Sequence, residues 1–285
     1  MDLTRRFVFR GNAAALGGQI VRPKTIIVDV DGASSLGVSG GRSSAEIKGR
    51  SFGDFIRFGS AMTFAQGLFD DEKAASAVTE HKGRQEDLTT STTVTAETRE
   101  VVVGRAPLPV FTAKRIRATL VSRKPEPNPS GEPSIAPAKD TTIQGVDIGG
   151  RVLEVHVNTS LFQKYDTRSK LVAAANDPKF IRSYGQHLVT TATIEGQRRK
   201  AGLISSSGVI YTTIVEKITW KGKPYPGASI DGHSVIVPDF GTIFFGELLI
   251  ASSERRLTMA RFELGSPDGG YVDFVDVGSN GSVYP

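Results

Sequence analysis

Apolar and polar positions follow one another most regularly in the segment 228–264. Three short apolar runs lie there: Ser234–Val237, Thr242–Ala251 and Leu257–Leu264. Proline, aspartate, serine and glycine separate these runs. Short apolar runs at a spacing of roughly ten residues, broken by turn residues, are typical of an antiparallel meander. We therefore expect this segment to form the core of a mainly β domain.

A period of two residues appears in other parts of the chain. The segment Leu88–Val103 is rich in threonine and valine, and its apolar residues alternate with polar ones. Such alternation of β-branched residues indicates a strand with one solvent-facing side. Further strands are expected at Phe7–Phe9, Thr25–Val30, Ser44–Lys48, Ile56–Phe64, Arg115–Arg123, Thr142–Ile148, Val152–Val157, His187–Ile194, Val209–Trp220 and Tyr271–Val277. The pattern predicts an antiparallel β-sandwich or barrel of about ten strands.

The segment 124–137 carries five prolines. Proline removes backbone hydrogen-bond donors and stiffens the chain, so this segment is predicted to be a long surface loop. Strand-like patterns of the same kind lie on both sides of it. They favour a loop within a single elaborated β domain spanning residues 1–285. Two β domains, 1–123 and 138–285, are the alternative.

A change of period marks the segment 160–184. Ser169–Ala175 has the composition of a short helix, and Asp177 followed by Pro178 combines a capping residue with a proline at the first helical position. A small helical insertion between strands is therefore expected here.

Two segments are rich in glycine. The segment 31–42 is rich in glycine and serine, which predicts a loop with tight turns. The segment 265–285 is rich in glycine, serine and aspartate, which predicts a flexible or docked C-terminal tail that follows or includes the strand expected at Tyr271–Val277.

Charge and composition narrow the function classes. The chain has 285 residues, with 35 basic, 30 acidic and no cysteine residues. The absence of cysteine excludes disulfides and thiolate metal sites. The basic residues are dispersed, whereas nucleic-acid-binding proteins concentrate them on one face, so a nucleic-acid partner is not favoured.

The hydropathy pattern also bears on the location of the protein. No stretch approaches the roughly 18 apolar residues of a membrane-spanning helix. The first residues contain an early acidic residue and no apolar core, so no signal peptide is expected. A cytoplasmic protein, or one exported without a classical leader, is consistent with this pattern.

No residue set forms a strong catalytic or metal-binding motif. Ser39 lies in a G-x-S-x-G sequence, but the nucleophile elbow needs a strand before it and a helix after it. Here a glycine-rich turn is the better interpretation. Glu247 and Glu263 lie within apolar runs and could in principle act as a carboxylate pair, but a shared solvent face explains them as well. We expect no enzyme activity, metal or cofactor, and a hydrolase remains an alternative.

One aromatic and basic cluster is a candidate ligand site. Aromatic rings next to lysines can bind carbohydrates, polyanions or a protein partner. A second basic run follows the predicted helical insertion. The residues assigned to this hypothetical site are Trp220, Lys221, Lys223, Tyr225, Arg198, Arg199 and Lys200.

Three phrases of the chain resemble the bacterial surface proteins of the choice-of-anchor P type. They are Ala33–Gly41, Asp140–Gly150 and Ser234–Ile250. The resemblance implies a β-rich structural or surface module, with no catalytic residues to carry over. The chain departs from the family pattern in its lack of a leader, its charged surface and the helical insertion.

These observations together favour a non-enzymatic structural protein that self-associates. β-Strand edges must be covered or paired, and oligomerisation does both. A filament, tube, shell or surface-layer subunit, held together through strand edges and the C-terminal tail, is the first hypothesis. A β module that binds carbohydrate or a polyanion is the alternative.

Overall fold

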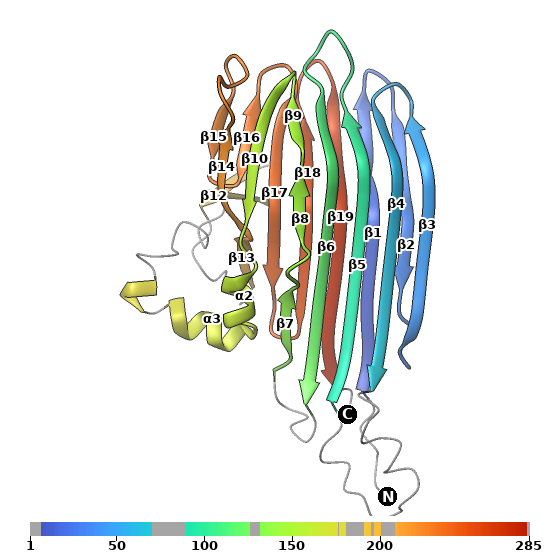
Figure 1. Cartoon of the computed structure of the whole chain (residues 1–285), viewed down its shortest axis with the longest axis vertical. Helices are drawn as coiled ribbons and strands as arrows, with labels where there is room; N and C mark the ends of the chain where they lie inside the picture. The colour runs from blue at the N-terminus through green and yellow to red at the C-terminus, as the bar shows by residue number, and fades with distance from the viewer. Residues whose placement is uncertain are drawn as a thin grey trace, which may run out of the picture.

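The fold is a sandwich of two large antiparallel sheets (Figure 1). The structure is a computed structural model. It describes residues 7–69, 89–125, 132–175, 177–180, 191–194, 197–200 and 209–283. The prediction of a mainly β, sandwich-like fold with a small helical insertion is confirmed.

Eight strands form the first sheet, here named sheet 1. Its order is β15-β16-β17-β18-β19-β1-β2, and β13 pairs with β17. The strands are β15 (Ser229–Asp231), β16 (Ser234–Val237), β17 (Gly241–Ile250), β18 (Glu254–Leu264), β19 (Gly269–Val283), β1 (Phe7–Arg22), β2 (Ile26–Ser35) and β13 (Ile210–Thr213). The predicted meander is confirmed, because β15 to β18 are neighbours in chain order.

Nine strands form the second sheet, here named sheet 2. Its order is β14-β10-β9-β6-β5-β4-β3, and β7 and β8 pair with β6. The strands are β14 (Val215–Trp220), β10 (Arg151–Val157), β9 (Val146–Ile148), β6 (Phe111–Pro125), β5 (Thr89–Val103), β4 (Ile56–Phe69), β3 (Gly41–Phe52), β7 (Ser134–Pro137) and β8 (Thr142–Gln144). A separate hairpin joins β11 (Thr191–Ile194) and β12 (Gln197–Lys200).

The described residues contain more strands than the roughly ten that the alternation predicts. Some predicted strands divide in two. The segment 209–220 separates at Ile214 into β13 and β14, which belong to different sheets. The segment 142–148 separates at Gly145, where the backbone has a positive φ of 64°. Both large sheets contain strands from before and after the proline-rich segment 124–137.

The predicted loop at 31–42 is largely wrong. β2 continues to Ser35 and β3 begins at Gly41, so only a tight turn separates them. Gly40 N donates to Gly37 O at 2.9 Å and closes this turn. Gly37 and Gly40 lie at this reversal, while Ser34 and Ser35 belong to β2.

The C-terminal segment is docked, which confirms the strand expected at Tyr271–Val277 and one of the two predicted states of the tail. It forms β19, a strand of 15 residues that pairs with β18 on one side and β1 on the other. Val272, Phe274 and Val277 are buried, while Asp273 and Asp276 lie on the opposite, outer face. The strand is longer than predicted, because glycine and serine surround the alternating part. Both edges of the strand are occupied, so it is not free to pair with another chain.

The helical insertion packs at one side of the sandwich (Figure 1). Helix α3 spans Arg168–Ala175, in agreement with the predicted helix, and α2 spans Ser160–Lys164. Phe162 and Leu171 are fully buried and belong to the main core. Neither these helices nor any other helix in the described residues is long and apolar enough to cross a membrane.

In each sheet, every long strand has a residue near its middle that is not paired with a residue of the neighbouring strand. These unpaired residues lie side by side and form a row across the sheet. We name the two rows, one in each sheet, the kink rows. In sheet 1 the row consists of Gly32, Ala15, Val275, Met259 and Gly246. In sheet 2 it consists of Gly49, Gly59, Glu100, Lys114 and Gly145. The kink rows coincide with positive φ angles at Gly32, Val275, Gly246, Glu100 and Gly145.

The kink rows change which side chains face the core. On β17, Ile243 and Phe245 are buried before Gly246, whereas Leu248 and Ile250 are buried after it. Inward residues therefore change from odd to even numbers at the row. In a regular strand the inward positions keep one parity throughout. The change of parity thus lengthens the buried apolar run of β17, and Phe244, which is buried beneath Arg261 on the outer face, also contributes to it.

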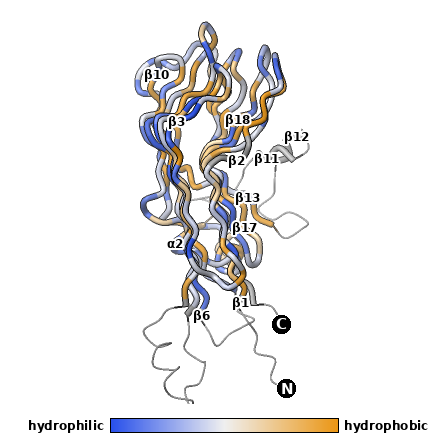
Figure 2. The backbone as a smooth tube through the Cα atoms, turned by 90° about the vertical axis from the view of Figure 1, so that its right-hand side faces the viewer, coloured by the Kyte–Doolittle hydropathy of each residue, from blue (hydrophilic) through white to orange (hydrophobic). Residues whose placement is uncertain are grey.

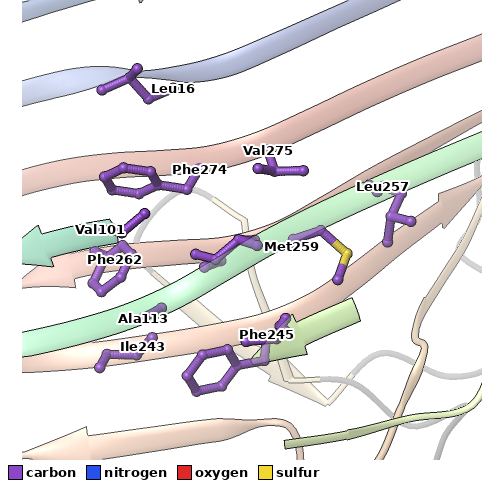
Figure 3. Packing of buried hydrophobic residues seen from close by; sticks show 14 of the residues in the cluster. Leu16, Val101, Ala113, Ile243, Phe245, Leu257, Met259, Phe262, Phe274 and Val275 are labelled. Carbon is purple, nitrogen blue, oxygen red and sulfur yellow. The ribbon is translucent and has the colours of Figure 1, made fainter. Parts of the chain in front are cut away.

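Aromatic side chains fill the core on the far side of the kink rows from the chain termini. The rings of Phe111 and Phe262 lie 4.9 Å apart edge to face, and those of Phe262 and Phe274 lie 5.7 Å apart. Figure 3 shows Phe245, Phe262 and Phe274 within this cluster. Such pairs add to the stability gained from apolar burial.

The core on the side of the chain termini contains several small side chains beside larger ones such as Phe9 and Leu120. Ala13, Ala65 and Ala96 are buried there. Two hydrogen bonds join the sheets directly: Ser34 Oγ lies 2.7 Å from Thr63 Oγ1, and Thr98 Oγ1 donates to Ala15 O at 3.1 Å. The two layers lie close together toward the end that carries the termini and diverge toward the other end (Figure 2).

We expect Gly246→Ala to destabilise the fold more than Gly232→Ala. Both glycines have positive φ angles, 62° and 58°. A Cβ at Gly246 would lie 2.8 Å from Ile214 Cγ1, whereas a Cβ at Gly232 would meet nothing within 4 Å. The expected losses in unfolding free energy are about 2–4 and about 1–2 kcal/mol. Urea unfolding measures both, and equal losses would contradict a packed kink row.

Candidate interaction surfaces

Two long edge strands lie together along one side of the sandwich (Figure 1). Among the described residues, β2 pairs only with β1, and β3 pairs only with β4. They have 10 and 12 residues, whereas the opposite edges, β15 and β14, have 3 and 6. Free strand edges are templates for pairing with another chain. The largest such template in the described part of the molecule is therefore the β2 and β3 side.

An exposed apolar patch lies next to β2 on the outer face of sheet 1. It consists of Val21, Ile27 and Tyr271, which are 45%, 65% and 53% exposed. Gln19 pairs with both Ile27 and Tyr271 in the register, and Val21 follows two residues later, where the pairing of β1 with β19 is irregular between Ile20 and Arg22. Grouped apolar side chains of this kind mark interaction surfaces more often than isolated ones do.

A charged network covers the outer face of sheet 1 around Glu247. Its carboxylate accepts hydrogen bonds from Arg261 Nε at 2.6 Å and Arg261 Nη2 at 2.8 Å. Arg261 also lies 4.0 Å above the ring of Phe244 and pairs with Glu263. Burial alone would raise the pKa of Glu247, but the contacts with Arg261 and His233 outweigh it and lower this pKa to about 2. Glu247 therefore stays ionised.

Asp273 has the opposite electrostatic environment. Its Oδ1 atom is buried and has no hydrogen-bond partner among the described residues. Burial and the nearby charge of Asp276 raise the pKa of Asp273 to about 6, although Arg261 opposes the shift. Asp276 is well bound, because it accepts from Arg256 Nε and from Thr258 Oγ1, both at 2.8 Å. The charged form of Asp273 is therefore the least stabilised carboxylate in this network.

A second buried carboxylate organises the outer face of sheet 2. Glu97 is 1% exposed and accepts from Arg115 Nη2 at 2.7 Å and Arg117 Nη1 at 2.8 Å. Arg99 also pairs with it. Burial would raise the pKa of Glu97, but the three arginines lower it to about 2. Glu97 and the three arginines therefore form one charged cluster that links β5 to β6.

The outer face of β3 to β6 is basic overall. Its basic residues are Arg42, Lys48, Arg57, Arg99, Lys114, Arg115, Arg117 and Arg123, and its acidic residues are Glu46, Glu97 and Glu100. Like charges in contact oppose association. Two copies meeting through this face would therefore repel each other, which leaves the strand edges as the better contact surface.

Comparison with known proteins places the chain in a family. Residues 7–251 match the family model described as "Domain of unknown function (DUF8256)". The chain belongs to this family. The DUF8256 match includes β1 to β17 and ends before β18 and β19. No curated protein and no solved structure matches the chain.

The aromatic residues of the hypothetical ligand site contribute to packing in this DUF8256 chain. Trp220 ends β14 and pairs with Leu153, and Trp220 and Tyr225 both pack against the main core. The ring of Tyr225 covers Gly149, where a Cβ would come within 2.6 Å of it. Lys221 and Lys223 are exposed in the following turn. Ligand binding by these four residues stays a prediction.

The second part of that hypothetical site lies on β12. Arg198, Arg199 and Lys200 pair through their backbone with Thr193, Ala192 and Thr191. Their side chains fall outside the described part of the structure. Whether they face Trp220 and Tyr225 stays a prediction.

The candidate catalytic residues are Ser39, which lies in a turn, and Glu247 and Glu263, which form ion pairs. Ser39 is in the turn between β2 and β3, and a strand follows it instead of the helix that a nucleophile elbow needs. Glu247 and Glu263 share Arg261, which pairs with both carboxylates. A general acid needs a raised pKa, whereas that of Glu247 is lowered. No group of three or more potential metal-binding side chains is present in the described residues.

Sequence analysis missed the Glu97 cluster and the apolar patch. Glu97 is paired with Arg117 across β5 and β6, twenty residues later in the chain. Ile27 and Tyr271 are brought together through β1. The alternation on each strand placed these residues on an outer face, but only the strand order shows which of them are neighbours.

Asp273→Asn is expected to stabilise the fold at neutral pH. Because the folded-state pKa of Asp273 is raised to about 6 from 3.8, the folded protein keeps a proton that the unfolded chain has already lost. This group therefore reduces stability as pH rises between these two values. The variant should gain about 1–2 kcal/mol at pH 7.5 and little at pH 4.

Chemical unfolding at both pH values measures this gain. The exposed Asp231→Asn serves as the control, and it should change stability little at either pH. The same gain from Asp273→Asn at pH 4 and pH 7.5 would contradict a raised pKa.

Proposed function

We propose that this chain is a non-enzymatic structural protein that self-associates through the side formed by β2 and β3. The observation that carries the proposal is the presence of two long, free edge strands on the same side of one sandwich. Unpaired N–H and C=O groups along a strand edge favour pairing with another strand. Pairing with a second copy satisfies these groups in both sheets at once.

The simplest contact is symmetric. In a two-fold dimer the same surface patch occurs on both partners. β2 of one copy then pairs antiparallel with β2 of the other and extends sheet 1 across the contact. Repetition through the shorter edges β14 and β15 would extend such a dimer into a larger assembly.

The side chains near β2 support the use of this edge. Ile27 is 65% exposed and lies on the edge strand itself. Val21 and Tyr271 extend the apolar surface inward from it. Covering these three side chains adds apolar burial to the backbone hydrogen bonds of an edge contact.

The ionised state of Glu97 and Glu247 supports a structural role for these two residues. Glu97 and Glu247 are held ionised by arginines instead of being poised to exchange protons. Three further points stay proposals. They are the use of the chain as a filament, tube, shell or surface-layer subunit, a bacterial source, and the likeness to choice-of-anchor P surface proteins. The C-terminal segment offers no free strand edge to this contact, because both edges of β19 are occupied, and it contributes only the side chain of Tyr271.

Ile27→Lys is expected to weaken self-association at least tenfold, because it places a strongly hydrated charge in the contact. Val152→Lys is the matched control: Val152 is an exposed valine on β10 in the other sheet, 44% exposed. Sedimentation velocity over a concentration series, with negative-stain microscopy, measures the assembly. A wild-type chain that stays monomeric at high concentration would overturn the proposal, as would equal effects of the two variants.

A further inference from the structure

A cleft of about 630 Å³ opens on the side of the sandwich opposite β2 and β3. Its walls come from both sheets. β10 and β14 of sheet 2 contribute His156 and Lys217, and the turn between β15 and β16 of sheet 1 contributes His233. A cleft of this volume lies in the size range of small-molecule sites.

The path of the chain produces this cleft. β13 and β16 both pair with β17, one after the other along the same edge. Between them the chain leaves sheet 1 and enters β14 of sheet 2. Ile214 N donates to Gly246 O at 2.9 Å, and Thr213 Oγ1 donates to Phe245 O at 3.0 Å, so both bonds anchor the crossing. The walls are therefore held by backbone pairing and not by a loop alone.

The cleft presents nitrogen atoms that are free to bind a ligand. His156 and Lys217 are exposed and opposite each other in the register of β10 and β14. Lys217 forms no ion pair within the described residues, and the nearest acid to His156 is Glu154, whose Oε2 lies 3.8 Å from Nε2. Glu216 is the acidic residue of the lining.

His233 forms the wall of the cleft on the side of sheet 1. Its side chain is only 5% exposed, and Glu247 Oε1 lies 3.6 Å from its Nε2, within ion-pair distance. His233 is therefore held in place by Glu247, and it leaves the binding of an anion to His156 and Lys217 on the opposite wall.

Apolar side chains complete the cleft. Val215, Ile218 and Ile230 line it. Ile230 is 38% exposed and presents its side chain to the surface, whereas Val215 and Ile218 are buried members of the core. We propose that this cleft binds a small organic anion, in which an apolar body packs against Ile230 and a carboxylate or phosphate group meets Lys217 and His156.

This site is separate from the contact surface proposed for self-association. It shares no residue with β2, β3 or the apolar patch, and it lies at the other side of the sandwich. It is also distinct from the hypothetical site at Trp220, although both use β14. The failure of one proposal therefore leaves the other intact.

Displacement of a fluorescent dye tests the proposal. The probe is 8-anilinonaphthalene-1-sulfonate, itself an organic anion with an apolar body. The competitors are 4-phenylbutyrate and 4-phenylbutanol, which share one apolar body and differ in charge. We expect phenylbutyrate to displace the dye at about a tenfold lower concentration than the neutral alcohol, the usual effect of one charged hydrogen bond.

Variants locate the effect in the cleft. Lys217→Gln should abolish the preference for phenylbutyrate, while Lys139→Gln, at an exposed lysine in the turn between β7 and β8, should retain it. The measurements are repeated in the Ile27→Lys background, because the dye can also bind the apolar patch. Equal displacement by both competitors, a preference that survives Lys217→Gln, or no dye bound in the Ile27→Lys background would each overturn the proposal.

Discussion

The alignment of the two kink rows is the constraint on which the rest of the fold depends. Every long strand changes the parity of its inward-facing residues at the same level of the sandwich. A strand that omitted the change would turn its apolar residues outward over half its length. The strands must therefore agree with one another, and glycine or a strained residue such as Val275 supplies the backbone conformation at alternate positions.

Buried carboxylates on the two outer faces follow a common design. Glu247 is adjacent to the kink row of sheet 1, and Glu97 lies three residues from that of sheet 2. Each is held by arginines on neighbouring strands. Breaking such a pair leaves an uncompensated charge, which costs far more than the pair itself contributes. These clusters therefore specify strand register as much as they add stability.

The two sides of the sandwich differ in character. One side ends in two long, regular edge strands beside an apolar patch. The other side is irregular, because the chain changes sheets at Ile214 and the helical insertion packs near it. A regular edge suits the pairing of backbones, whereas an irregular edge leaves space between walls. Association and ligand binding are accordingly assigned to opposite sides.

The sequence by itself determined the mainly β class, the meander of β16 to β18, the long strand β5 and the helix α3, because alternation and capping are local signals. It did not determine the full length of β19, where glycine and serine surround the alternating part Tyr271–Val277, or the extension of β2 and β3 into 31–42. Only the tertiary structure decided the kink rows, the arginine partners of Glu97, and the meeting of His156 and His233 at one cleft. Those features depend on which strands are neighbours and in what register, and pairing between residues far apart in the chain leaves no mark in any single segment.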